Sequence, residues 1–92
     1  MIQSFKHKGL EIFFTTGSKK GIKPEHAQKI ERILDRLDAS ISPNDMNLPG
    51  YRLHELKGQD SGIWSVTVNA NWRITFEFDG QNAILVDYRD YH

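Results

Sequence analysis

The sequence predicts an α+β domain in which two antiparallel helices pack on an antiparallel β-sheet. Up to about residue 41 the apolar residues recur at intervals of three and four, as on one face of a helix. From Tyr51 onward they alternate with polar residues, as in strands with one buried face. Helices followed by a run of strands are typical of α+β proteins. The length of 92 residues suits one hydrophobic core, so we expect a single domain over residues 1–92.

Two helices are expected in the first half of the chain. The stretch KGLEIFFTTG, residues 8–17, gathers apolar side chains before Gly17, and a glycine is a common helix end. A longer helix is predicted over residues 24–41, because Pro24 suits the first helical position and an apolar stripe follows it. The stripe consists of Ala27, Ile30, Ile33, Leu34, Leu37 and Ile41. Residues 42–50, with two prolines and a glycine, predict irregular structure.

Strands are predicted from short runs rich in β-branched and aromatic residues and separated by turns. These runs are residues 2–5, 51–56, 62–71, 71–80 and 82–88. In the second run we expect Leu53 and Leu56 to face inward. The last run, NAILVDY, is apolar on both faces, so we expect it to be covered on both sides.

The composition excludes several classes of site. The chain has no cysteine, so neither disulfides nor thiolate-bound zinc can form. Equal numbers of basic and acidic residues, 12 of each, argue against a protein that coats nucleic acid by charge alone. No apolar run approaches the ~18 residues of a membrane span, and the N-terminus lacks a signal-peptide core. We therefore expect a cytoplasmic protein with no membrane partner.

The first candidate for chemistry is HELKG, residues 54–58. A zinc-protease motif would need a second histidine where Gly58 stands, so that interpretation is rejected. His54 can take or give a proton near neutral pH, and Lys57 carries a positive charge that can face a phosphate. The alternative, which spacing alone favours, is that both are ordinary exposed residues.

The second candidate is Arg73, which faces outward on a strand whose other face is apolar. A guanidinium there can bind a phosphate through two N–H groups. The favoured alternative is a pair with Glu77 or with an acid on the next strand. The following turn decides what lies opposite Arg73. With a three-residue loop, Asp87 lies opposite Arg73, and with a two- or four-residue loop, Val86 or Tyr88 lies there. The sequence does not decide which loop forms.

The third candidate is DYRDYH, residues 87–92, which follows directly from an apolar strand. Asp90, Tyr91 and His92 can all titrate or form hydrogen bonds. Because His54 and His92 come from different segments, they could share the roles of acid and base in one site. Binding of a metal ion by His54, Asp90 and His92 is the alternative.

Four stretches of the chain resemble the HigB type of toxin in the RelE/ParE toxin–antitoxin superfamily. They are MIQSFKHKGLEIFF, YRLHELKG, GIWSVTVNANWRITFEF and DYRDYH, and together the resemblance covers nearly the whole chain. It implies a RelE-like microbial RNase toxin fold and a toxin of a type II toxin–antitoxin system. Such toxins are ribosome-dependent, metal-independent mRNA endonucleases that use the RNA 2′-hydroxyl as nucleophile and inhibit translation.

The resemblance also implies the partners, and it implies no cofactor. The expected partners are a HigA-like antitoxin with a helix-turn-helix fold, the 70S ribosome and mRNA in its A site. Operator DNA is expected to be bound only through the antitoxin.

Matched position by position, the resemblance implies roles for six residues and no metal. The catalytic residues would be His54, Asp90, Tyr91 and His92, and the RNA- or phosphate-binding residues would be Lys57 and Arg73. The two histidines would form the acid–base pair, with Asp90 orienting one of them. Lys57 and Arg73 would stabilise the charge at phosphorus. Tyr91 would stack on a base or hold the phosphate.

A different function is possible within the same superfamily. ParE-like toxins bind and inhibit DNA gyrase without catalysis, and they lack this set of polar residues. His54 and His92 argue against that alternative.

Overall fold

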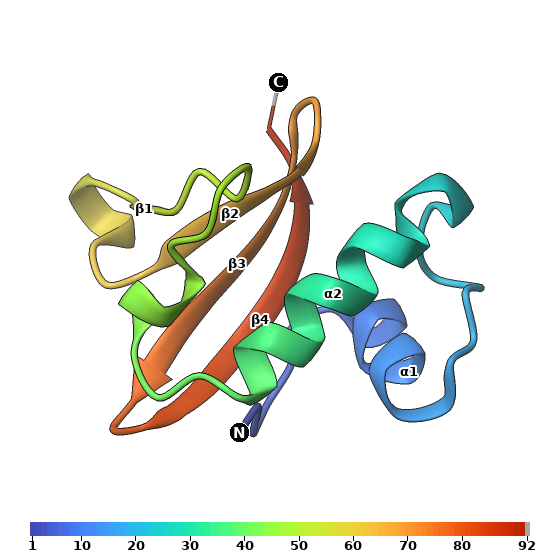
Figure 1. Ribbon diagram of the computed structural model, residues 1–92, viewed down its shortest axis with the longest axis horizontal. Helices are drawn as coiled ribbons and strands as arrows, with labels where there is room; N and C mark the ends of the chain where they lie inside the picture. Colours follow the sequence, from blue (N-terminus) through green and yellow to red (C-terminus); the bar gives the residue numbers. More distant parts are fainter. Residues whose placement is uncertain (92) are drawn as a thin grey trace.

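The computed structural model describes residues 1–91, with the backbone alone at Asp60, and within them two α-helices and one four-stranded sheet are formed (Figure 1). The helices are α1 (Lys8–Thr16) and α2 (Ala27–Asp38), and the strands are β1 (His54–Glu55), β2 (Trp64–Asn69), β3 (Trp72–Asp79) and β4 (Asn82–Asp90). Neighbouring strands are antiparallel, in the spatial order β1-β2-β3-β4. The predicted α+β class is therefore confirmed.

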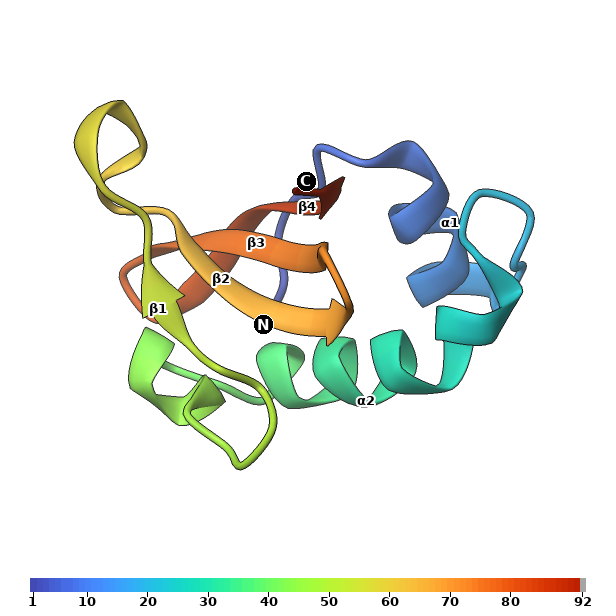
Figure 2. The same ribbon diagram turned by 90° about the horizontal axis from the view of Figure 1, so that it is seen from above.

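The hydrophobic core lies between α2 and one face of the sheet, as Figure 2 shows from above. Five of the six residues in the predicted apolar stripe are buried: Ala27, Ile30, Ile33, Leu34 and Leu37. From the sheet they meet Val66, Ile74, Phe76, Ala83 and Val86. This packing fixes which face of each strand is covered by α2 and which face is left for polar side chains.

Helix α1 begins and ends as the sequence predicts. Gly17 follows its last turn with φ of 81°, a left-handed conformation that glycine adopts without strain. The backbone N–H of Gly17 donates to the carbonyl of Phe13. At the other end, the Nδ1 atom of His7 accepts the N–H of Leu10 at 3.0 Å, which caps the helix.

Helix α2 is shorter than the predicted residues 24–41. Residues Pro24–His26 form a separate 3₁₀ turn, and the α-helix ends at Asp38. Beyond it, the Ser40 hydroxyl donates to the carbonyl of Arg36 at 2.7 Å, and the chain turns away. Ile41 therefore lies past the helix and is 57% exposed, so its assignment to the buried stripe is wrong.

The segment 42–50, which the sequence predicts as irregular, contains the 3₁₀ turn Pro43–Met46. The Asp45 carboxylate accepts the backbone N–H groups of Ile41 and Ser42, at 2.9 and 3.3 Å. These bonds stabilise the start of the turn, as capping residues do in longer helices. Met46 is thereby placed in the core, where it is fully buried.

Two of the predicted strands are shorter than expected. Residues 2–5 form only two isolated parallel bridges to β4, Ile2 with Ala83 and Phe5 with Val86, and so cover its outer edge. Strand β1 is reduced to two residues of the predicted 51–56, because Arg52 has a left-handed φ of 52° that interrupts the extended backbone. Leu53 and Leu56 are both half-buried.

A one-residue bulge in β4 decides which side chains face the core. Glu77 pairs with Ile84 but Thr75 pairs with Asp87, so β4 carries one extra residue between these points. Leu85, with a left-handed φ of 54°, lies at the bulge and is 38% exposed. The expectation that residues 82–88 are covered on both sides is thus wrong at Leu85.

The described part of the chain offers no helix with the length and apolar character that a membrane span requires.

Candidate active site

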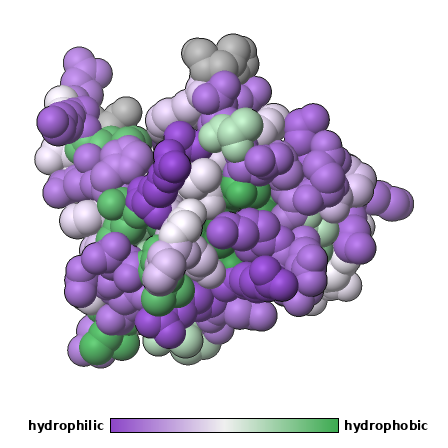
Figure 3. Space-filling model, turned by 45° about the horizontal axis from the view of Figure 1, so that its top comes forward, coloured by the Kyte–Doolittle hydropathy of each residue, from purple (hydrophilic) through white to green (hydrophobic). Residues whose placement is uncertain are grey.

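Polar side chains cover the face of the sheet opposite the core. Cross-strand register places His54, Ser65, Thr75 and Asp87 in one row, and Thr67, Arg73 and Arg89 in the next. We call these seven residues the polar face. The surface around the end of β4 and the 58–60 turn is mainly hydrophilic, with small apolar areas between (Figure 3). The polar face contains the groups that acid–base and phosphate chemistry require.

His54 and Lys57 lie at the β1 end of this face. His54 is exposed, and its Nδ1 atom lies 3.2 Å from the carbonyl oxygen of Arg52. Lys57 is exposed immediately before the turn Gly58–Asp60. Arg73 lies two strands away from His54, so their Cα atoms are roughly 12 Å apart on ordinary strand spacing. A substrate bound between His54 and Arg73 would be within reach of both side chains.

Arg73 is half-buried on β3, and its neighbour on β4 is Arg89. All three predicted neighbours of Arg73 are wrong. The two-residue turn between Asp79 and Asn82 alone would place Tyr88 opposite it, and the bulge in β4 then shifts the register by one more residue. The Arg73 guanidinium donates through Nη1 to the carbonyls of Ala70 and Trp72, at 2.7 and 3.2 Å.

Tyr91 joins the polar face through Arg89. The Arg89 Nη1 group donates to the Tyr91 hydroxyl at 2.9 Å, and the backbone N–H of Tyr91 donates to the carbonyl of Asn71 at 2.8 Å. The Arg89 Nε group donates to Asp87 Oδ2, also at 2.9 Å. Burial by itself lowers the pKa of Arg89, but the hydrogen bonds to Asp87 and Tyr91 outweigh it, so this pKa is raised overall.

Asp90 belongs to the other side of the strand. It is the last residue of β4 and pairs in register with Trp72, whose ring lies 4.6 Å from that of Tyr88. Burial is the main reason that the pKa of Tyr88 is raised, and the negative charge of Asp90 adds to the effect. His92, the remaining catalytic candidate, lies outside the described residues.

Several residues near the site were missed by sequence reasoning. Asp87 and Arg89 alternate with Tyr91 along DYRDY, and this period of two was the signal that would have found them. His26 was read only as part of a helix, yet it is 3% exposed, and its Nδ1 atom lies 2.6 Å from the Tyr88 hydroxyl. This pair supports the β3–β4 end of the sheet from the core side.

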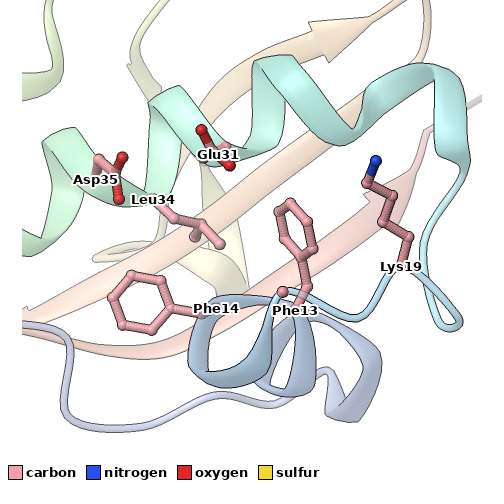
Figure 4. Close-up of a pocket in the computed structure, with 7 residues that line it drawn as sticks. Phe13, Phe14, Lys19, Glu31, Leu34 and Asp35 are labelled. Carbon is pink, nitrogen blue, oxygen red and sulfur yellow. The ribbon is translucent and has the colours of Figure 1, made fainter.

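The structure also contains a groove of about 370 Å³ between α1 and α2 (Figure 4). It is lined by Phe13, Phe14, Gly17, Lys19, Glu31, Leu34 and Asp35. None of the five predicted site residues that the structure describes, His54, Lys57, Arg73, Asp90 and Tyr91, lines it. The candidate site is therefore the polar face of the sheet and not this groove.

Among the side chains that the structure describes, which exclude those of Asp60 and His92, no group of three or more histidine, aspartate or glutamate residues is arranged to hold a metal ion. The alternative metal site of the sequence includes His92, and so it is not described by the structure.

Comparison with known proteins identifies the family of this chain. The family model described as the RelE-like toxin HigB of type II toxin–antitoxin systems matches residues 3–92. The chain is similar to "Endoribonuclease HigB" of Proteus vulgaris, with 47% identity covering 100% of both proteins. It is also similar to "Toxin HigB-1" of Vibrio cholerae serotype O1, with 33% identity covering 100% of this chain and 98% of the other. The chain therefore belongs to the HigB-like family of RelE-like toxins from type II toxin–antitoxin systems.

Proposed function

We propose that this toxin is an endoribonuclease that cleaves mRNA on the translating ribosome, with the RNA 2′-hydroxyl as nucleophile and without a metal ion. The observation that carries the proposal is the convergence of His54, Arg73 and Tyr91 on one side of the sheet, in a chain 47% identical to "Endoribonuclease HigB". An acid–base group can transfer the protons that cleavage of a phosphodiester requires, a fixed cation can stabilise the charge at phosphorus, and a phenol can donate a hydrogen bond to the phosphate.

The reaction assigns a task to each candidate residue. A base removes the proton of the 2′-hydroxyl, the 2′-oxygen attacks phosphorus, and the bond from phosphorus to the 5′-oxygen breaks. An acid then protonates the leaving 5′-oxygen, so the products are a 2′,3′-cyclic phosphate and a 5′-hydroxyl. We assign the base and acid to His54 and His92 as a pair, with Asp90 biasing one of them.

Positive charge stabilises the crowded phosphorus of the transition state. Arg73 offers a planar guanidinium from the middle of the sheet, and Lys57 offers a mobile ammonium from the loop after β1. Tyr91 would contact the phosphate or stack on a base. His54, Lys57 and Tyr91 are exposed, which suits a substrate that is presented by a larger assembly.

The ribosome with mRNA in its A site would be that presenting body, which places the activity in the cytoplasm. A formal net charge of zero supports this, since charge alone would give the toxin little hold on free RNA. Toxins of this family have an antitoxin as partner. We propose that this antitoxin is of the HigA type, with a helix-turn-helix fold that also carries the complex to operator DNA.

The test is to map new mRNA 5′ ends on translating ribosomes with the wild type, His54→Gln and His92→Gln. We expect in-frame cuts that fade in both variants and disappear when the nucleotide at the cut is 2′-deoxy. Cleavage that survives the 2′-deoxy substitution would refute the mechanism. Absence of cuts combined with double-strand DNA breaks in arrested cells would favour the gyrase-inhibiting alternative.

A further inference from the structure

We propose that Arg89 is an additional active-site residue: with Arg73 and Tyr91 it forms a subsite for one phosphodiester group of RNA, and Asp87 positions it. The assignment deepens the proposed RNA-cleaving function and rests on it for the identity of the ligand.

The first argument is the like-charge pair across the sheet. Arg73 on β3 and Arg89 on β4 are directly opposite in register, on the polar face. Side chains so paired have Cβ atoms about 5 Å apart, and like charges in this position destabilise a sheet. An anion that binds between two guanidinium groups removes this repulsion.

The second argument is the balance of charge. Asp87 forms an ion pair with Arg89, at 2.9 Å from Nε to Oδ2, and its other oxygen accepts the N–H of Tyr88 at 2.9 Å. Two arginines and one aspartate leave a net charge of +1 on this part of the polar face. A phosphodiester carries a single negative charge, which matches it.

The third argument is the direction of the hydrogen bonds. A guanidinium has five N–H donors, and the bonds to Asp87 and Tyr91 engage two of those on Arg89. The Tyr91 hydroxyl accepts from Arg89, so its own proton is directed elsewhere and is made a stronger donor by the neighbouring cation. Donors from Arg89 and Tyr91 can thus meet at one phosphate oxygen.

The competing explanation is that Asp87 and Arg89 form an ion pair that serves stability alone. Their side chains are only 21% and 25% exposed, and for a largely buried ion pair the cost of desolvation offsets much of the attraction, so the pair is weak evidence of a stabilising role. A purely structural pair would have no reason to hold Tyr91. If Arg89 binds a phosphodiester, its surroundings change when RNA is added. If the ion pair serves stability alone, they do not change.

The first experiment is an NMR titration of the full chain with an RNA trinucleotide made uncleavable by 2′-deoxy substitution. We expect the Nε–H signals of Arg73 and Arg89 to shift together and to saturate. The signal of Arg32, exposed on α2, should stay in place. An Arg89 signal that stays in place while the Arg73 signal shifts would overturn the proposal. Because this readout needs no cleavage, it separates failure of the subsite from failure of the proposed activity.

The second experiment measures single-turnover cleavage on ribosomes by Arg89→Gln, Tyr91→Phe and the double variant. We expect Arg89→Gln to lose on the order of 100-fold in rate, as when one preorganised donor is removed. The double variant should be no slower than the slower single variant, because the two side chains act together. Arg89→Lys keeps the charge but lacks the fork that spans Asp87 and Tyr91, so it should recover only part of the rate.

The matched control is Arg32→Gln, which removes the same charge from the exposed side of α2, outside the proposed subsite, and should stay within about twofold of wild type. A wild-type rate in Arg89→Gln would contradict the proposal. So would losses that multiply in the double variant, since they would mean that Arg89 and Tyr91 do not act together on one phosphate.

Discussion

Two fully buried hydroxyl groups under the candidate site give the sharpest test of how its polar face is built. Ser65 Oγ and Thr75 Oγ1 are both 0% exposed, are neighbours across β2 and β3, and have no hydrogen-bond partner among the described residues. Burying a hydroxyl without a partner costs about 1–3 kcal/mol on the evidence of protein variants. Each of these two hydroxyl groups should therefore lower the free energy of unfolding by about this amount.

The perturbation is Thr75→Val, which replaces the hydroxyl with a methyl group of nearly the same size. The cavity stays filled and the desolvation cost disappears, so the free energy of unfolding should rise by about 1–2 kcal/mol. For a domain of this length, about 1 kcal/mol corresponds to roughly 4–8 °C in Tm. We therefore expect a gain of roughly 4–16 °C.

The assay is urea and thermal unfolding of the wild type, Thr75→Val and a control, Thr67→Val. Thr67 lies on the same polar face but is only half-buried, so its substitution should change stability by less than about 0.5 kcal/mol. Destabilisation by Thr75→Val would refute the reasoning, because it would mean that the hydroxyl has a partner such as an internal water.

Thr75 and Ser65 also stand between His54 and Asp87 in one row of the polar face. If the row serves the reaction, Thr75→Val should be more stable and yet cleave RNA more slowly, which is the usual exchange of stability for activity at a site. The ribosome cleavage assay checks this. Full activity in a stabilised variant would show that the hydroxyl has no part in the reaction.

Three further outcomes follow from the contacts. Tyr88→Phe should lower the free energy of unfolding by about 1–3 kcal/mol, because it leaves buried His26 Nδ1 without its partner at 2.6 Å. Urea titration measures this loss, and the double variant His26→Leu/Tyr88→Phe should recover part of it. Burial raises the pKa of Tyr88, so in a spectrophotometric titration its tyrosinate absorbance should develop at higher pH than that of a free tyrosine. The contribution of Tyr88 to stability should fall as the pH rises above about 10, where the unfolded chain already releases this proton. Ala70→Gly should raise the free energy of unfolding by about 1 kcal/mol, as measured by thermal unfolding, because Ala70 has a left-handed φ of 51°. A lower free energy of unfolding in this variant would refute the claim of strain at Ala70.

The helices were predictable where the signal is local. Gly17 ends α1 because a left-handed residue is needed there, and the spacing of Ile30, Ile33 and Leu37 fixes the buried side of α2. The end of α2 was not predictable, because Ile41 continues the apolar spacing. The helix ends because the Ser40 hydroxyl donates to the carbonyl of Arg36, and this side-chain hydrogen bond competes with the backbone bonds of one more helical turn.

The candidate site was predictable as a set of residue types and not as an arrangement. His54, Arg73 and Tyr91 were found in the sequence, but Arg89 was not, since only the register of β3 and β4 places it opposite Arg73. Register depends on turn length and on bulges together, and the sequence constrained only the turn.

By itself, the sequence determined that Asp87 and Arg89 share one side of a strand, because side chains alternate along it. Only the tertiary structure decided which side that is. The backbone N–H of Leu85 donates to Ser4 Oγ at 2.8 Å, and that of Val86 donates to the carbonyl of Ser4 at 3.1 Å. These bonds to a residue about eighty positions earlier accompany the bulge in β4, which turns Val86 toward the core and Asp87 and Arg89 away from it.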